Sequence, residues 1–388
     1  MRYVSTIFSQ LVEPLSRRRF EAVVARRHGD AYDKSFRSWD HLMALIHAQL
    51  SGLDSLRGLV ESWNAHPNAH YHLGGGRLAR STLADANGRR PVEVFAEAFA
   101  MVAGLTDRST RSEAKKLLRL IDSTPIPLGK LFDWAKSNGR VRGMKAHLVY
   151  DPDRDLPRIL DITHANVNDA EIGRRIEIET GLTYVFDKGY CHYGWWRAIH
   201  AAGAFFVTRP KTNMGLTARA DRPCGASRGD GFTVIGDQEV VLSSKGDSKL
   251  DIPLRRIEIL RDEDGKTICV IANDMTRSAL DIAQAYKFRW QIELLFRWLK
   301  QHLHLRKFLG SNENAIKLQI HAAMIAYVLL RLAARAARTK FAILRFTELV
   351  SVCLFERRSL AAIEKPPPIN PSKKKAPRNP FQIEFQYV

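Results

Sequence analysis

The segment from Tyr286 to Lys300 holds a carboxylate that could bind a divalent cation and basic side chains that could bind phosphate. Apolar residues alternate with them at helical spacing, which predicts a helix that docks by its apolar face and presents one acid among cations. An ordinary surface helix with an Arg289–Glu293 ion pair has the same pattern, and such a pair stabilises a helix by only tenths of a kcal/mol. At about 100° per residue, a sector of about 60° contains Tyr286, Arg289, Glu293 and Lys300, joined by Arg297, and the opposite side contains Phe288, Ile292, Leu295, Phe296, Leu299 and Leu303.

The spacing Y-x2-R-x3-E-x6-K resembles the signature of the IS-four family of bacterial insertion-sequence transposases, and all four signature positions match. That family has two aspartates upstream, each at the end of a strand of an RNase H-like sheet. Asp122 follows the apolar run LLRLI, and Asp187 follows TYVF and precedes Lys188-Gly189-Tyr190, which resembles the family's D-x-G-Y motif. Each aspartate alone would be read as a turn or capping residue. Their order and the complete signature favour the catalytic interpretation over roughly residues 116–310.

The resemblance implies that Asp122, Asp187 and Glu293 are the catalytic and metal-binding carboxylates of a DNA transposase. Phosphodiester cleavage and transfer use two divalent cations about 3.5 to 4 Å apart, one activating the nucleophile and one stabilising the leaving oxygen. Mg²⁺ prefers oxygen ligands, so carboxylates suit it, and Mn²⁺ is the expected substitute. We expect Asp122 to bridge both ions, and Asp187 and Glu293 each to hold one.

The resemblance also implies DNA-binding residues around the glutamate. Tyr286, Arg289 and Lys300 are expected to contact phosphates of the transposon end, Arg289 by bidentate hydrogen bonds and Lys300 as a point charge. Trp290 occupies the position at which hairpin-forming relatives place a tryptophan against a displaced base. A partly buried aromatic residue is an equally good interpretation of Trp290 from the sequence.

The other residues that could ligate a metal are scattered. His164, His192 and His200 have no second ligand at helical spacing, and the four cysteines form no C-x-x-C pair. These spacings argue against a zinc hydrolase and against a disulfide scaffold. The adjacent Trp195 and Trp196 are expected in the core rather than on a DNA-binding surface.

The hydrophobic period changes along the chain and predicts a multidomain α+β protein with an RNase H-like mixed sheet. In the first part, a helix near Ser81 or Thr82 that carries Arg77, Arg80, Arg89 and Arg90 is either a DNA-contacting helix or a solvated basic face. The expected divisions are an all-α, DNA-binding N-terminal domain (1–115), the first part of the catalytic core (116–212), an inserted β subdomain (213–275), a helical end of the core with the Glu293 helix (276–360) and a basic Pro/Lys-rich tail (361–388).

The net charge of +19 and the pI near 9.9 favour a polyanionic partner. The excess lies mostly in residues 276–388, whereas residues 117–275 are nearly neutral, as a site built from acidic residues requires. We expect double-stranded DNA as the partner, a homodimer on paired transposon ends, no membrane association and a cytoplasmic, nucleoid-associated location. An RNase H-like nuclease without strand transfer and a domesticated DNA-binding protein remain as alternatives.

Overall fold

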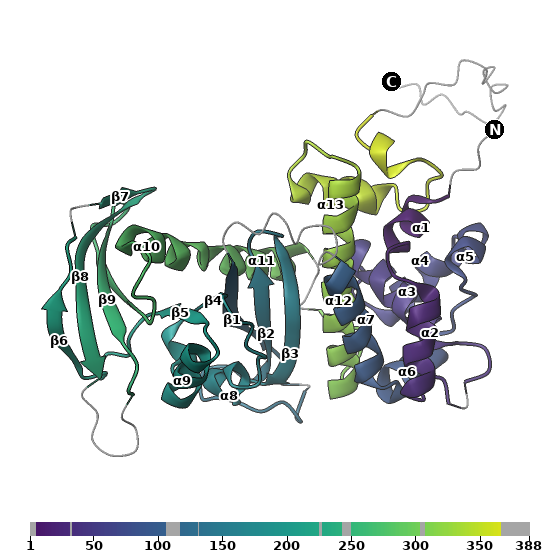
Figure 1. Ribbon diagram of the computed structural model, residues 1–388. Coiled ribbons are helices and arrows are strands. Elements are labelled where there is room, and N and C mark those ends of the chain that lie inside the picture. Colours follow the sequence, from purple (N-terminus) through teal and green to yellow (C-terminus); the bar gives the residue numbers. More distant parts are fainter. Residues whose placement is uncertain are drawn as a thin grey trace, which may run out of the picture.

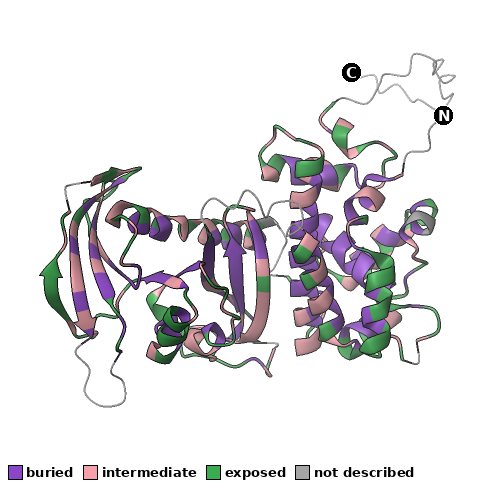
Figure 2. Cartoon of the chain, viewed as in Figure 1, coloured by how far each residue is buried: buried purple, intermediate pink, exposed green. Residues whose placement is uncertain are grey.

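The computed structural model describes residues 5–31, 33–105, 117–130, 132–224, 227–242, 250–302 and 307–365. Figure 1 shows a bundle of helices beside a long sheet that carries further helices. Buried side chains run through both bodies (Figure 2). The expected combination of a mixed sheet and flanking helices is confirmed.

The sheet has ten strands in the order β3-β2-β1-β4-β5-β10-β9-β8-β6, with β7 paired to β8. At its centre, β1 is antiparallel to β2 and parallel to β4, and β4 is parallel to β5. The central strand β4 is buried along its whole length, which explains its continuous apolar sequence TYVF. The first five strands are β1 (Leu118–Pro127), β2 (Gly143–Asp151), β3 (Leu156–His164), β4 (Thr183–Phe186) and β5 (Phe205–Thr208).

Two helices connect these strands. Helix α8 (Asp169–Gly173) follows β3, and α9 (Tyr193–Ala201) lies between β4 and β5. Trp195 and Trp196 are buried, and the Trp196 ring stacks on Phe206 of β5 with centroids 4.8 Å apart. Both tryptophans are therefore core residues, as predicted.

The β structure expected as an inserted subdomain continues the same sheet. Strand β10 pairs with β5, so the edge that β5 would otherwise expose is covered. A hairpin turn joins β9 and β10, where Gly265 adopts a φ of 65°. The added strands are β6 (Leu216–Asp221), β7 (Ser227–Gly229), β8 (Phe232–Leu242), β9 (Leu254–Arg261) and β10 (Thr267–Ala272).

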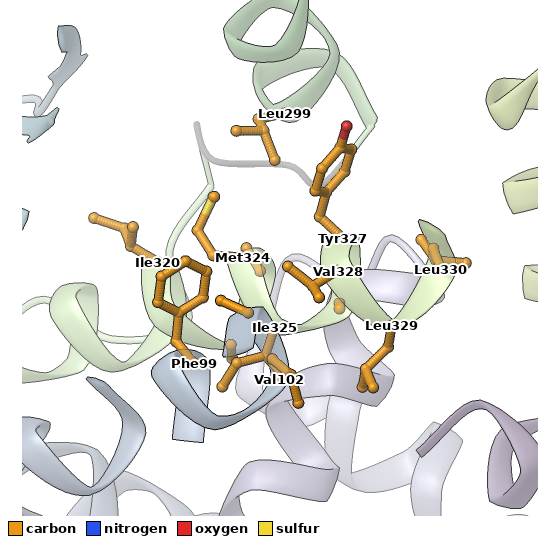
Figure 3. Packing of buried hydrophobic residues seen from close by; sticks show 14 of the residues in the cluster. Phe99, Val102, Leu299, Ile320, Met324, Ile325, Tyr327, Val328, Leu329 and Leu330 are labelled. Atoms are coloured by element: carbon orange, nitrogen blue, oxygen red, sulfur yellow. The ribbon is translucent and has the colours of Figure 1, made fainter. Parts of the chain in front are cut away.

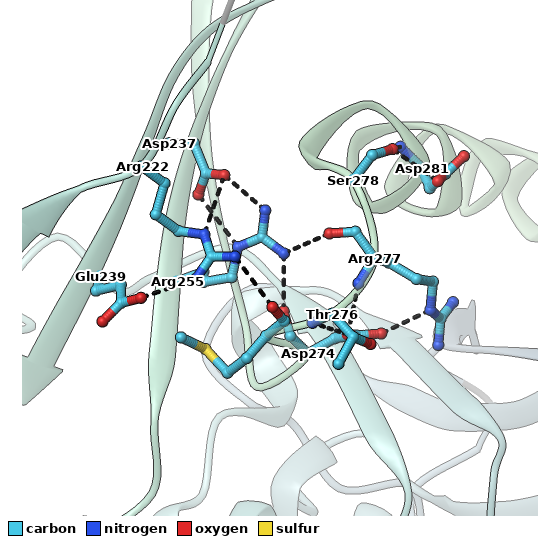
Figure 4. A network of polar contacts seen from close by, with 10 residues as sticks. Arg222, Asp237, Glu239, Arg255, Asp274, Thr276, Arg277, Ser278 and Asp281 are labelled. Carbon is cyan, nitrogen blue, oxygen red and sulfur yellow. Dashed lines mark hydrogen bonds and ion pairs between the residues drawn. The ribbon is translucent and has the colours of Figure 1, made fainter.

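A buried ion-pair network joins this extension to the chain that enters α10 (Ala279–Phe288) (Figure 4). Arg255 of β9 donates to Asp237 of β8 at 2.6 and 3.2 Å, and also to the carbonyl oxygens of Asp274 and Arg277. Arg222 adds a second cation, 3.7 Å from the Asp237 carboxylate. Because both Arg255 and Asp237 are buried, the network fixes the start of α10 against the sheet.

The helical bundle is built from both ends of the chain. Helix α12 (Glu313–Ala336) packs on α3 and α7, and Figure 3 shows Phe99 and Val102 of α7 against its apolar residues. The chain ends meet where Ile7 N donates to Glu356 O at 3.0 Å. The bundle comprises α1 (Ile7–Val12), α2 (Arg17–Arg26), α3 (Ser38–Leu50), α4 (Leu56–Asn64), α5 (Pro67–Leu73), α6 (Arg80–Arg89), α7 (Val92–Gly104), α12 and α13 (Ile343–Val352).

This arrangement differs from the expected division in the helices that follow α11. Of the helices expected at the end of the catalytic core over residues 276–360, α10 and α11 (Trp290–His302) lie on the sheet. Helix α12 packs mainly on the bundle helices α3 and α7, although it also contacts β3, and α13 packs on α12 and α3. The reason is that α12 is apolar around most of its circumference, and 83% of its most apolar window is buried in the protein. It is long and apolar enough to cross a membrane by composition, yet it serves as a core helix. The expected boundary near residue 115 and most of the tail, residues 366–388, lie outside the described residues.

The basic helix predicted near residue 80 is present but only part of it is accessible. Helix α6 begins at Arg80 after Ala79, so neither Ser81 nor Thr82 caps it. Arg90 is buried and forms ion pairs with Asp30 and Asp33, which excludes it from a DNA-contacting surface in this conformation. The side chains of Arg77, Arg80 and Arg89 are exposed.

We expect a fragment of residues 1–115 to unfold without cooperativity and to bind a hydrophobic dye, because α3 and α7 would expose the apolar surface that α12 covers. Joining residues 307–365 through a flexible linker to residues 5–115 should restore cooperative unfolding, since the two chain ends already meet. Circular dichroism during heating measures the cooperativity of unfolding of both proteins, and dye fluorescence measures the exposed apolar surface. Cooperative unfolding of the short fragment alone would contradict this assignment of α12.

We expect Asp237→Ala to lower the free energy of unfolding by about 3 to 5 kcal/mol, because it leaves the buried Arg255 guanidinium without its carboxylate. Denaturant titration measures the change. The control is Asp230→Ala, which breaks an exposed pair with Lys287 and should have little effect. Equal effects of the two substitutions would show that the buried network does not stabilise the sheet extension.

Candidate active site

Asp122 and Asp187 lie beside each other on neighbouring parallel strands. The β1–β4 ladder pairs Ile121 with Phe186, and the two aspartates are the next residues on their strands. Asp187 directly follows the end of β4, as predicted. Asp122 does not end its strand, because β1 continues to Pro127 by antiparallel pairing with β2. What ends after Ile121 is only the pairing with β4, and this opening brings the two carboxylates to one place.

The helix expected to run unbroken from Tyr286 to Lys300 is interrupted at Arg289. Helix α10 ends at Phe288 and α11 begins at Trp290, with Arg289 between them. Hydrogen bonds to residues three positions earlier form this turn: Arg289 N donates to Tyr286 O, and Ile292 N donates to Arg289 O. The break changes the directions of the side chains before it relative to Glu293.

Arg289 joins the carboxylate of the sheet to that of the helix. Its Nη1 lies 3.2 Å from Asp122 Oδ2, and its Nη2 lies 2.6 Å from Glu293 Oε1. The guanidinium also lies 5.6 Å from the centroid of the Tyr286 ring. The structure therefore brings Asp122 together with Arg289 and Glu293, which lie far from it in the sequence.

Tyr286 differs from the expectation of an outward-facing phosphate contact. It is only 8% exposed, and its hydroxyl is buried without a hydrogen-bond partner. The turn at Arg289 accounts for this, since Tyr286 sits on α10 and packs toward the sheet. In this conformation a phosphate does not reach the hydroxyl.

The acidic side chains occupy a poorly hydrated environment. Burial raises the pKa of Asp122 to about 6, although the positive charge of Arg289 and the Ser123 backbone N–H oppose the rise. The negative charges of Glu293 and Asp187 raise the pKa of Asp122 further. One oxygen of Asp187, Oδ1, is buried with no hydrogen-bond partner. These groups would be stabilised by an additional positive charge.

The donor chemistry of this cluster fits a hard divalent cation, since every candidate ligand is a carboxylate and one buried oxygen has no partner. Within the part of the chain that the structure describes, no three His, Cys, Asp or Glu side chains already form a group that could hold a metal ion. Arg289 lies between Asp122 and Glu293 and takes that place with its own charge. A metal site here therefore requires the guanidinium to move.

The outer face of α11 carries an aromatic residue beside the carboxylates. Trp290 is 52% exposed, so about half of its surface is buried and the other half is accessible to a ligand. Arg297 lies 5.9 Å from the centroid of its ring. Lys300 is half-buried on the same helix as Glu293. The apolar side of α11 is buried as predicted at Ile292, Leu295, Phe296 and Leu299, while Leu303 falls outside the described residues.

A polar group behind the two aspartates was not anticipated from the sequence. It contains Asp169 of α8, whose carboxylate contacts Ser123 of β1 and Lys145 of β2. A signal was present in the alternation of Lys145 and His147 on an otherwise apolar strand, since polar residues there must find partners. His164, His192 and His200 form no zinc site among the described residues.

Comparisons with known proteins show which family the chain resembles. The model of a family described as Transposase DDE domain matches residues 113–329, and that of a domain of unknown function (DUF4372) matches residues 4–75. A Sinorhizobium fredii protein named as a candidate transposase, y4zB, is 63% identical over 81% of this chain and 91% of its own length. A Geobacillus stearothermophilus protein, named as a probable transposase for insertion sequence element IS5377, is 30% identical over 66% of this chain and 67% of its own.

The fold also resembles a solved structure. The piggyBac transposase, in a synaptic complex with hairpin DNA, matches with a TM-score of 0.50 at 9% identity, covering 94% of this chain and 83% of that chain. At this identity the likeness concerns the fold alone, a mixed sheet with flanking helices of the RNase H-like type. The paired aspartates and the glutamate helix lie within the matched transposase domain, and the relatives carry transposase names. The chain therefore belongs to the DDE transposase family, as an enzyme of the insertion-sequence type that acts on DNA.

Proposed function

We propose that this transposase cleaves DNA at the ends of its insertion sequence and joins the freed 3′ ends to target DNA, with Asp122, Asp187 and Glu293 as its catalytic carboxylates. The observation that carries the proposal is the meeting of these acids. Two follow directly after a paired position of neighbouring parallel strands, and the third is linked to Asp122 through Arg289. A DNA-binding protein without activity would have no need to bury acids that a polyanion repels.

Mg²⁺ is the metal that this ligand set fits best, with Mn²⁺ as a substitute. Asp122 would contribute to both ions because it adjoins Asp187 on one side and is linked to Glu293 on the other. Bound ions would supply activation of the attacking oxygen and stabilisation of the leaving oxygen. The protein itself orients the scissile phosphate at these half-buried acids.

Arg289 has two roles in this proposal. Without metal it offsets the repulsion between Asp122 and Glu293, and with metal and DNA bound it turns to a phosphate of the transposon end. Lys300 and, after a local rearrangement, Tyr286 add contacts to the same backbone. Trp290, exposed on the face of α11 next to Glu293, stacks on a displaced base.

The wider assembly follows from the same chemistry. Two ends have to be cut and joined together, and each chain offers one set of acids, so we propose a homodimer on paired ends. The helical bundle, with exposed arginines on α6, would bind the terminal inverted repeats. An RNase H-like nuclease without strand transfer would cleave the same DNA but join nothing, which a strand-transfer assay on target DNA detects.

We expect Asp122→Asn, Asp187→Asn and Glu293→Gln each to reduce cleavage of transposon-end DNA to background, because each removes a ligand charge with little change in shape. Gel-shift titration should give nearly wild-type DNA affinity. Lys300→Ala should instead weaken end binding and lower its salt dependence while leaving residual cleavage. A chelator should stop cleavage by the wild type. Cleavage by Glu293→Gln at the wild-type rate in Mg²⁺ would contradict the proposed function.

We expect Arg289→Gln to bind Mn²⁺ on the order of tenfold more tightly than the wild type in the absence of DNA, because the competing guanidinium is gone. The same substitution should slow cleavage, since a phosphate contact is lost. Calorimetric titration with Mn²⁺ measures the affinity. Arg297→Gln removes an equal charge from the outer face of the same helix and should leave Mn²⁺ affinity unchanged. Weaker Mn²⁺ binding by Arg289→Gln would refute the proposal that the guanidinium and the metal ion compete for the same carboxylates.

A further inference from the structure

Asp169 lies on the opposite side of β1 from Arg289 and Glu293. Successive residues of a strand point to opposite faces, so Asp122 faces α11 while Ser123 faces α8. Asp169 is the first residue of α8 and meets Ser123 there. It is thus close to the catalytic strand without reaching the face that carries the acids.

The Asp169 carboxylate is bonded to side chains of two neighbouring strands, β1 and β2. Its Oδ1 accepts a hydrogen bond from Ser123 Oγ at 2.9 Å and one from Lys145 Nζ, also at 2.9 Å. Lys145 also donates to Val167 O, just before α8. Because the Lys145 side chain is only 12% exposed, its charge depends on Asp169 for neutralisation.

The same carboxylate also packs against the turn that carries Asp187. A Cβ placed on Gly189 would lie 3.2 Å from Asp169 Oδ2, so a larger residue would press on this group. The next residue, Tyr190, is buried, with its hydroxyl 3.4 Å from Nδ1 of His147. This contact gives a physical reason for glycine in the D-K-G-Y segment.

A short chain of bonds connects Asp169 to the active site. Asp169 accepts from the Ser123 hydroxyl, and the Ser123 backbone N–H donates to Asp122 Oδ1 at 2.8 Å. On the other side, Gly189 lies two residues after Asp187. We propose that Asp169 is a positioning residue that fixes the separation of Asp122 and Asp187 from behind the sheet, so that both present their oxygens to the same metal ions. The inference rests on the proposed roles of these two acids.

The test compares full-length Asp169→Ala and Asp169→Asn with Glu171→Gln, which removes an acid from the same helix that pairs with the exposed Arg175. Mn²⁺ affinity without DNA, affinity for end DNA in chelator, and the Mg²⁺ concentration at half-maximal cleavage are measured. We expect Asp169→Ala to weaken Mn²⁺ binding and to raise the Mg²⁺ requirement on the order of tenfold, as for the loss of a residue that orients a metal ligand. Asp169→Asn, which keeps an acceptor oxygen, should have a smaller effect. DNA affinity should stay within about twofold, and Glu171→Gln should match the wild type.

A purely structural role for Asp169 would lower thermal stability and leave the metal dependence unchanged, and that result would overturn the inference. If Asp169→Ala does not fold, Ser123→Ala removes only the hydrogen bond between β1 and Asp169. The double mutant Ser123→Ala/Asp169→Asn should then bind Mn²⁺ as tightly as the weaker-binding of the two single variants. Additive losses of Mn²⁺ affinity would overturn the inference. Cleavage by Glu293→Gln at the wild-type rate would refute the proposed function. If Asp169→Ala cleaves DNA with the same Mg²⁺ requirement as the wild type, only this inference is refuted.

Discussion

Gathering several carboxylates in a half-buried place costs free energy, and the ion pairs of the Arg289 guanidinium with these carboxylates offset this cost. The guanidinium contacts Asp122 on the sheet and Glu293 on the helix, so it also fixes the height of α11 above β1. Neither acid would stay near the other without a cation between them. The position of α11 relative to the sheet therefore depends on the charge of one side chain.

Contacts at the two ends of the α10–α11 segment determine where these helices lie. The ion-pair network around Arg255 anchors the entry to α10 on the sheet extension. At the other end, Trp298 of α11 meets Tyr327 of α12 edge to face, with ring centroids 5.0 Å apart. The segment that carries Glu293 is thus held between the sheet and the helical bundle, and α12 links α11 to the bundle.

Much of the candidate site could be predicted from the sequence because helical spacing and the D-x-G-Y turn constrain Glu293 and Asp187 locally. The turn at Arg289 could not be predicted, because the spacing of apolar residues continues through it and fits one uninterrupted helix. Similarly, an apolar period shows that α12 has a buried surface but not which partner covers it, so its place in the bundle was missed. Asp169 follows Asn168 at the start of a helix, where an acid is ordinary, and only the fold reveals its contacts.

The position of α12 also has a consequence for synthesis of the protein on the ribosome. Helices α1 to α7 are made first, yet the helix that completes their core ends at Ala336, so their packing waits until the sheet has been translated. At about 5 to 20 residues per second, that interval is roughly 10 to 50 seconds. During this time the nascent bundle exposes apolar surface suited to chaperones. A truncated message that stops before α12 would therefore yield a chain bound for degradation rather than a competitor for DNA ends.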